Sequence, residues 1–281
     1  MSASCVERSG DGHVGLVDVG ANLAHDSFDD DRAAVLERAL AVGVTRLIVT
    51  GSSVESSLQA AELAEGWPGR LFATAGVHPH HAVDWSPASG RVLRALATRP
   101  AVVAVGECGL DYFRDFSPRE AQRTAFEAQL ELAAECGLPV FLHQRDAHED
   151  FARILAPAMP RLAGGAAHCF TGDAGMLREY LDLGLYVGIT GWICDERRGA
   201  ALRASCAEIP LDRVLIETDA PYLLPRTLDP KPKSRRNEPR YLPEVLRVAA
   251  AAMGRTEETL ARASTANAER LFRLPSQTPA P

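Results

Sequence analysis

Short runs of consecutive apolar residues recur along the chain and alternate with segments in which apolar residues are spaced three or four apart. Runs such as LIVT, VVAV and VLIET lack a strict apolar/polar alternation, which is typical of parallel strands covered by helices on both faces. Successive runs start 30, 25, 31, 37, 27, 20 and 28 residues apart, which leaves room for one strand and one helix. The eight predicted strands are Leu16–Leu23, Arg46–Ser52, Leu71–His78, Val102–Asp111, Pro139–Asp146, Ala166–Gly172, Tyr186–Gly191 and Val214–Tyr222.

The segments between the strands carry helical patterns, of which Ser117–Cys136 is the clearest. We expect Ser117 to cap this helix, Pro118 to occupy its first position and Glu120 to complete a capping box. Further helices are predicted over Asp29–Ala41, Tyr241–Ala252 and Glu257–Phe272.

Strand and helix alternating eight times predict an α/β protein with a parallel sheet, and eight units favour closure into a TIM (β/α)8 barrel. An open doubly wound sheet is the alternative. No linker or shift of composition divides the chain, so we expect one barrel domain over residues 16–273. Residues 1–15 and 274–281 are expected to be flexible termini.

Composition places the chain among ordinary globular proteins. Of 281 residues, 46% are hydrophobic and 24% charged, which excludes a disordered or fibrous chain. The net charge of −7 excludes a global cationic field for nucleic acid but leaves room for a local basic patch. Six scattered cysteines without a C-x-x-C pair indicate reduced thiols. With no apolar run of about 18 residues, no segment is expected to span a membrane, and we expect a cytoplasmic protein.

Ionisable residues gather at the ends of five predicted strands, where a barrel places its chemistry. Taken singly, each has an ordinary explanation: a rim histidine, half of an ion pair, or, for Asp219, a helix cap. Together, two imidazoles and two carboxylates at one mouth form a mixed nitrogen and oxygen set for a divalent cation. The set is His143, His168, Glu107 and Asp219, and His78 and His80 are further histidines at the same mouth.

Such a site suits hydrolysis, because a bound divalent cation lowers the pKa of water. Glu107, central in the sequence order, is the candidate to bridge two ions, at the spacing suited to phosphoryl transfer. Asp219 is expected to bind a metal, to accept a proton from the attacking water, or both. His78 and His80 are expected to contact a phosphate or protonate a leaving oxygen, or else to stabilise the loop at Pro79.

At these residues the chain resembles the TatD family of metal-dependent deoxyribonucleases, within the amidohydrolase-like superfamily of barrel hydrolases. The resemblance runs from about Val17 to Phe272. Its motifs are DVGANL (18–23), TAGVHPH (74–80), VGECGLDY (105–112), VFLHQRDA (140–147), AHCFTG (167–172), GITGWICDERRG (188–199), IETDAPYLLPR (216–226) and RRNEP (235–239).

The resemblance implies a TIM barrel in which Glu107, His143, His168 and Asp219 match the family's metal-binding positions. It implies Mg²⁺-dependent hydrolysis of DNA phosphodiesters, from the 3′ end of single strands, with RNA as a further substrate and a role in DNA repair. His78 matches a family histidine near the scissile phosphate.

One departure from the family pattern concerns the first strand. Many relatives carry an H-x-H pair at its end, where this chain has Gly20 and Asn22. We therefore predict one metal site from Glu107, His143 and His168 and a second, looser one from Glu107, Asp219 and water. Asn22 offers only an amide oxygen, a weak ligand. One or two ions are expected, and an oxygen-rich, open site favours Mg²⁺ or Mn²⁺ over tightly held Zn²⁺.

A basic segment gives this acidic chain a means of holding single-stranded DNA. Residues 226–240 carry six basic and two acidic side chains and follow the last strand, so they are expected at the mouth. A solvated loop that never meets substrate is the alternative. Trp192, Tyr112 and Phe113 follow strand ends and are candidates to stack on bases or to pack at the rim. The predicted nucleic-acid-binding residues are Lys231, Lys233, Arg235 and Arg236.

Two other functions remain open at this point: a barrel hydrolase of a small amide, ester or lactone, and a non-catalytic, metal-dependent nucleic-acid binder. The basic segment favours a nuclease over the small-substrate hydrolase. Many amidohydrolases have a carbamylated lysine that bridges two metals. This chain has His143 at the end of the fifth strand instead of a lysine, which also favours a nuclease. The protein is expected to act as a monomer.

Overall fold

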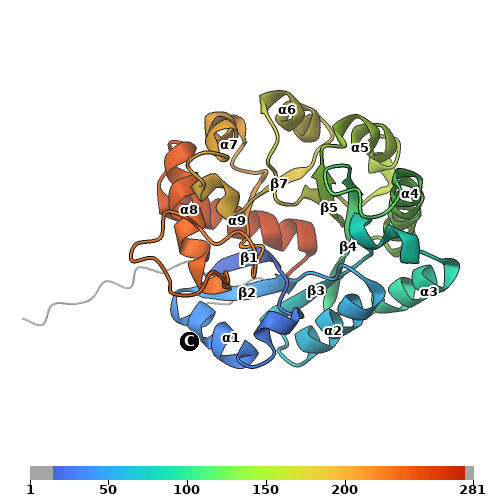
Figure 1. The fold of residues 1–281 in the computed structure, drawn as a ribbon, viewed down its shortest axis with the longest axis horizontal. Helices are drawn as coiled ribbons and strands as arrows, with labels where there is room; N and C mark the ends of the chain where they lie inside the picture. Colours follow the sequence, from blue (N-terminus) through green and yellow to red (C-terminus); the bar gives the residue numbers. More distant parts are fainter. Residues whose placement is uncertain (1–14, 276–281) are drawn as a thin grey trace, which may run out of the picture.

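Eight parallel strands form one sheet in a computed structural model that describes residues 15–275. The strands lie side by side in sequence order, and helices surround them (Figure 1). Their bounds are β1 (Leu16–Ala21), β2 (Val44–Val49), β3 (Leu71–Ala75), β4 (Val102–Asp111), β5 (Val140–Arg145), β6 (Gly165–Ala167), β7 (Tyr186–Ile189) and β8 (Val214–Ile216).

Nine α-helices follow or connect these strands within residues 15–275. They are α1 (Arg32–Ala41), α2 (Val54–Glu65), α3 (Pro87–Leu96), α4 (Arg119–Cys136), α5 (His148–Leu155), α6 (Ala174–Asp182), α7 (Ala200–Ser205), α8 (Leu242–Ala252) and α9 (Glu257–Phe272). Short 3₁₀ turns are η1 (Asp26–Phe28), η2 (Pro79–Asp84), η3 (Met159–Arg161), η4 (Gly191–Cys194), η5 (Cys206–Glu208) and η6 (Pro239–Tyr241). No helix of this part of the chain is long and apolar enough to cross a membrane.

The first and last strands meet beyond the end of β8. The Asp219 N–H donates to the Gly20 carbonyl at 2.8 Å, and the Asn22 N–H donates to the Ala220 carbonyl at 2.7 Å. These bonds bring the two edges of the sheet together into a nearly closed barrel. The predicted (β/α)8 architecture is confirmed, and all eight predicted strands are present.

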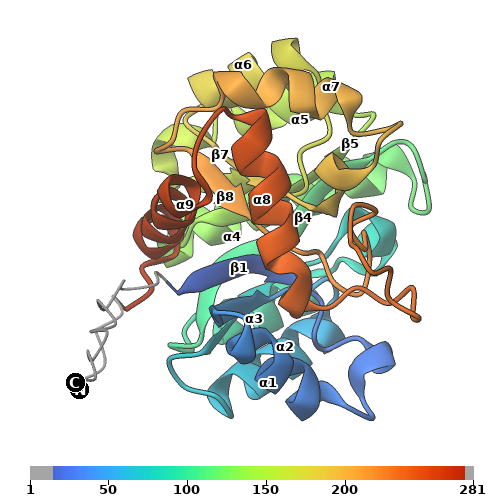
Figure 2. The same cartoon turned by 90° about the vertical axis from the view of Figure 1, so that its left-hand side faces the viewer.

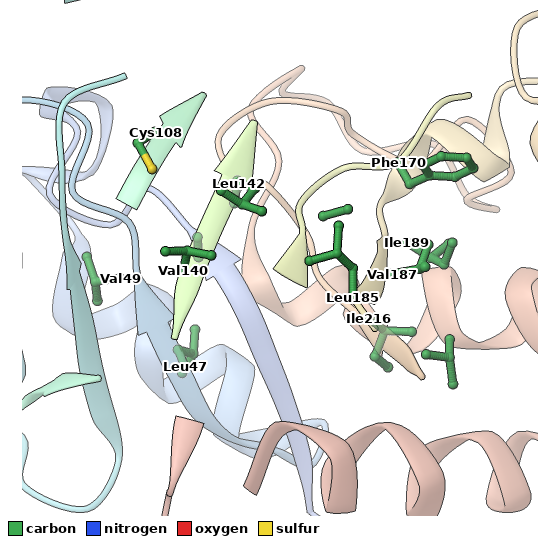
Figure 3. Packing of buried hydrophobic residues seen from close by; sticks show 14 of the residues in the cluster. Leu47, Val49, Cys108, Val140, Leu142, Phe170, Leu185, Val187, Ile189 and Ile216 are labelled. Atoms are coloured by element: carbon green, nitrogen blue, oxygen red, sulfur yellow. The ribbon is translucent and has the colours of Figure 1, made fainter. Parts of the chain in front are cut away.

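The apolar side chains of the strands form two layers, because neighbouring residues of a strand point to opposite faces. Leu47, Val49 and Val140 belong to the large core shared with the surrounding helices (Figure 3). The intervening Ile48 and Phe141 belong to a smaller cluster that also contains the last residues of α9. This helix lies across the barrel beneath β1 and β8, so the opposite end stays open for chemistry (Figures 1 and 2).

The predicted cap of the long helix is wrong. The helix α4 begins at Arg119, after Pro118, and Ser117 makes no capping bond. Its hydroxyl instead donates to the His80 carbonyl at 2.9 Å and accepts the Val83 N–H at 3.3 Å. Ser117 therefore ties η2 to the start of α4, because those backbone groups come closer to it than the first turn of the helix does.

The expected termini lie mostly outside the described residues, which begin at Gly15 and end at Pro275. Leu274, at the edge of the described part, is buried against α9. The domain bounds of 16–273 stay a prediction. The five cysteines within residues 15–275 are free thiols.

Candidate metal and nucleic-acid site

The four predicted metal ligands lie together at the carboxyl end of the barrel. Glu107 belongs to β4 and His143 to β5, His168 directly follows β6, and Asp219 lies three residues after the end of β8. All four line one cleft of about 570 Å³. His78, His80 and Asn22 line the same cleft.

Glu107 stands at the centre of this group. Its Oε1 atom lies 3.0 Å from His143 Nδ1, 3.4 Å from His78 Nε2 and 3.9 Å from His168 Nε2. Burial disfavours a charged carboxylate here, but the three imidazoles outweigh it and hold the pKa of Glu107 well below its usual value. Glu107 is therefore an anion in reach of every other member of the cluster.

His168 is oriented by Glu217, a residue to which the sequence analysis gave no role. Glu217 is fully buried, and its Oε2 atom lies 2.7 Å from His168 Nδ1. The carboxylate can only accept, so Nδ1 carries a proton, and Nε2 is the nitrogen that would bind a cation once the cation displaces its proton. Burial alone would lower the pKa of His168, but Glu217 and Glu107 raise it to about 10.

Asp111 holds His143 in a similar way. Its Oδ2 atom lies 3.2 Å from His143 Nε2 and 2.9 Å from His80 Nε2. Its Oδ1 atom accepts the backbone N–H groups of Phe113 and Arg114. Burial opposes ionisation of Asp111, but the bonds to His143 and His80 outweigh it and keep its pKa far below the usual value. His143 therefore turns Nδ1 toward Glu107.

His78 serves as a hydrogen-bond donor in this cleft. Its Nδ1 atom accepts the backbone N–H of His80 at 3.1 Å. Burial lowers the pKa of His78 well below its usual value, so the ring is neutral and its single proton is on Nε2, which faces Glu107. In this tautomer Nε2 is a hydrogen-bond donor, and the catalytic role of His78 stays a prediction.

Asp219 and Asn22 form a pair at the opposite wall. Asn22 Nδ2 donates to Asp219 Oδ1 at 3.0 Å, so Asn22 acts here as a donor and not through the amide oxygen expected of a weak ligand. Burial first, and then Glu107 and Glu217, raise the pKa of Asp219 to about 7 against the opposing effect of His168. Asp219 has φ 56°, a left-handed backbone conformation that is rare outside glycine and concentrates at functional sites.

The donor set fits a divalent cation. Ligand atoms of His78, Glu107 and His143 lie within 4.8 Å of one another, as do those of His168, Cys169 and Asp219. Burial raises the pKa of the Cys169 thiol well above its usual value, so Cys169 stays a neutral thiol in contact with Thr190. Two imidazoles (His143 and His168) and two carboxylates (Glu107 and Asp219) converge on this cleft, which are donor types that a divalent cation takes.

Comparison with known proteins identifies the family. The model of the TatD related DNase family matches residues 17–273. This chain belongs to that family. The TatD-family chain is 52% identical over 261 residues to the 3′-5′ ssDNA/RNA exonuclease TatD of Erwinia billingiae, covering 93% of this chain and all of that protein.

Solved structures agree with this assignment. The crystal structure of YJJV, a TatD homolog from Escherichia coli, has a TM-score of 0.85 at 30% identity and covers 93% of this chain and 99% of that one. A lactonase from Listeria monocytogenes has a TM-score of 0.63 at 13% identity, covers 94% and 96%, and shows the shared barrel fold alone. The resemblance and the nuclease family predicted from the motifs are confirmed, and the small-substrate hydrolase is not supported.

The predicted DNA-binding residues of the TatD-family chain divide into two kinds. Lys231, Lys233 and Arg235 are exposed on the long segment that follows β8. Arg236 is half-buried, and its guanidinium binds Asp31 at 2.8 Å and Glu238 at 3.0 Å. These ion pairs hold the segment against the start of α1, so the Arg236 guanidinium is already engaged within the protein.

The aromatic candidates also separate. Trp192 lines the metal cleft, and Phe113 lines a pocket beside it. Tyr112 donates its hydroxyl to Asp150 at 2.7 Å, and the Arg119 guanidinium covers its ring at 4.2 Å. Tyr112 is therefore fixed between α4 and α5 and does not line the cleft.

Three polar residues of the site had no predicted role: Asp111, Glu217 and Arg145. Each lies at or directly after the end of a strand, which is the signal that selected the metal ligands. The sequence does not reveal which of these residues bond to one another, because contacts such as that of Glu217 with His168 join residues 49 positions apart.

Proposed function

We propose that this TatD-family chain is a divalent-cation-dependent exonuclease that removes nucleotides from the 3′ end of single-stranded DNA and RNA. The observation that carries the proposal is the convergence of Glu107, His143, His168 and Asp219 on one open cleft. The family match and the activity printed for the relative from Erwinia billingiae support the substrate class.

Each side chain has a defined part in this proposal. Glu107, His143, His168 and Asp219 would hold the cation, which supplies Lewis acidity and favours deprotonation of water near neutral pH. Asp219 accepts the proton of the attacking water, because its carboxylate lines the same cleft as the other proposed cation ligands. His78 donates Nε2–H to an oxygen of the scissile phosphate. Two of the four ligands are carboxylates in an open cleft, a donor type that Mg²⁺ and Mn²⁺ prefer, so we expect one of these ions rather than tightly held Zn²⁺.

The direct test uses single-stranded DNA and RNA labelled at either end, incubated with Mg²⁺, Mn²⁺ or EDTA. We expect release of the 3′ label as mononucleotide, late loss of the 5′ label, and no reaction in EDTA. Glu107→Ala should abolish release while the circular dichroism spectrum stays that of the native fold. Undiminished cleavage by Glu107→Ala, or digestion from the 5′ end, would overturn the proposal.

Cytoplasmic location, the monomeric state and a part in DNA repair stay predictions from the sequence. Size-exclusion chromatography with light scattering tests the second of these directly.

A further inference from the structure

A second pocket, of about 280 Å³, opens beside the metal cleft at the carboxyl end of β5 and β6. Its volume is close to the lower end of ligand pockets in proteins, about 300 Å³. Five residues line both spaces, so the pocket and the cleft are continuous. These shared residues are Gln144, Arg145, His168, Thr171 and Trp192.

The inner wall of this pocket is aromatic and apolar. Phe170, Tyr180 and Met176 line it but do not line the metal cleft. The rings of Phe170 and Tyr180 meet edge to face, with centroids 5.7 Å apart. Flat, polarisable walls of this kind suit a planar, weakly polar group rather than a flexible aliphatic one.

The entrance of the pocket is cationic. The Arg145 guanidinium lies 4.2 Å from the ring centroid of Phe113 and 5.8 Å from that of Trp192. Arg198 covers Trp192 at 4.4 Å, but its guanidinium is paired with Asp195 at 2.9 Å, so the charge at the entrance is that of Arg145. Stacking on neutral rings fixes Arg145 without neutralising its charge, so the guanidinium is available to an anion that passes from the cleft into the pocket.

Gln144 and Tyr180 bond to each other inside the pocket, which Asp146, His168 and Thr171 also line. Gln144 Nε2 donates to the Tyr180 hydroxyl at 2.9 Å, and Gln144 Oε1 accepts the Ala147 N–H at 3.0 Å. The second hydrogen of the Gln144 amide and the proton of the Tyr180 hydroxyl therefore remain for a ligand. Every nucleobase has a flat face for the walls and acceptors on its edge for these donors.

We propose that this pocket binds the base of a nucleotide flanking the scissile phosphodiester, while the phosphate itself lies in the metal cleft. The inference rests on the nuclease function proposed above and adds a base-binding subsite to it. Stacking tolerates any base, so the subsite would grip the strand end without reading sequence. Arg145 would hold the backbone at the passage between the two spaces.

The test compares oligodeoxynucleotides that differ by one base. One series carries an abasic residue at either nucleotide flanking the 3′-terminal phosphodiester; the reference strand is intact, and a second reference is abasic ten positions upstream. In the wild-type protein with Mg²⁺, kcat/KM should fall roughly tenfold for one of the terminal abasic strands, the value expected from the loss of one base stack. The upstream abasic strand should behave like the intact one.

Two variants locate the effect. Met176→Trp fills the pocket from α6, at a residue that does not line the metal cleft, and should bring the intact-to-abasic ratio close to one. The volume-conserving Met176→Leu should keep the wild-type ratio. Should Met176→Trp fail to fold, Trp192→Ala against Trp192→Phe gives the same comparison at the rim.

The outcomes separate the two proposals. No cleavage of any strand by the wild-type protein would reject the nuclease function itself. Cleavage with equal kcat/KM on intact and terminally abasic strands would reject the subsite alone. A ratio that persists in Met176→Trp would place base recognition outside this pocket and would also overturn the inference.

Discussion

Oε2 of the fully buried Glu217 lies 2.7 Å from Nδ1 of His168. The Cys169 N–H donates to the other oxygen of Glu217 at 2.6 Å, so both carboxylate oxygens are engaged. This arrangement fixes the tautomer and the orientation of His168, and points Nε2 at Glu107 and Asp219. Carboxylates that orient ligand histidines typically change metal affinity or activity by 10- to 100-fold when mutated.

We therefore expect Glu217→Gln to weaken Mn²⁺ binding by about 10- to 100-fold, because an amide cannot accept from both His168 and Cys169. Isothermal titration of the purified protein with Mn²⁺ measures this directly. Glu208→Gln is the matched control, since Glu208 is exposed and pairs only with Arg178. Unchanged Mn²⁺ affinity in Glu217→Gln would show that His168 needs no such support, or does not bind the cation.

Gly20 provides the space that Glu217 occupies. A Cβ atom at Gly20 would lie 2.6 Å from Glu217 Oε2 and 3.3 Å from His168 Nδ1. Gly20→Ala should push the carboxylate from the imidazole and weaken Mn²⁺ binding to a similar extent as Glu217→Gln. Gly90→Ala, where the new Cβ meets only the Trp85 ring at 3.5 Å, is the control. If Gly20→Ala binds Mn²⁺ like the wild type, the contact is not essential.

Replacing His78 should affect the rate of cleavage and not the binding of the cation. Because its proton is on Nε2, replacing it should remove a donor and leave the cation ligands intact. We expect His78→Ala to lower kcat on single-stranded DNA by about 10²- to 10⁴-fold, the usual contribution of a positioned proton donor. Mn²⁺ affinity should change little. A large loss of Mn²⁺ affinity would instead make His78 a ligand.

The strand ends explain why so much of this site was visible in the sequence. Apolar runs followed at once by His or an acid marked Glu107, His143, His168 and Asp219, and the barrel brings all such ends to one mouth. Strand ends cannot reveal which neighbour orients which ring, because that depends on side-chain direction across strands that are distant in sequence. Glu217 had no assigned role for this reason.

Predictions made from local sequence rules failed where another group of the folded protein bonded to the residue. Ser117 satisfied every requirement of a helix cap, yet its hydroxyl bonds to η2. Arg236 carries the same charge as Arg235, but its guanidinium forms ion pairs with Asp31 and Glu238. In both cases the residue type was correctly noted and its partner was supplied by the fold.

Asp18 makes stability depend on pH. This buried carboxyl accepts the Thr218 N–H and hydroxyl; burial first, opposed by these bonds, raises its pKa from 3.8 to about 7. Between these values the folded protein binds more protons at Asp18 than the unfolded chain does, so this contribution to the free energy of unfolding decreases as pH rises from about 4 to 7.

Asp18→Asn removes this titration. Its free energy of unfolding should fall less than that of the wild type between pH 5 and 7.5, as measured by urea denaturation in EDTA. Asp182→Asn, at an exposed position in α6, should follow the wild type. A parallel pH dependence in Asp18→Asn and wild type would show that Asp18 is ionised throughout in the folded protein.

The basic segment after β8 provides the last prediction. Each phosphate contact with a single strand contributes about 0.7 to the slope of log K against log salt. Lys233→Ala with Arg235→Ala should therefore flatten this slope by about 1.4, as measured by fluorescence anisotropy of labelled DNA in Ca²⁺ or EDTA. The control is the charge-matched pair Arg255→Ala with Arg262→Ala. Arg255 precedes α9 and Arg262 lies in it, at the end of the barrel opposite the metal cleft, so this pair should leave the slope unchanged. Equal slopes for both pairs would mean that the exposed cations of this segment do not contact the strand.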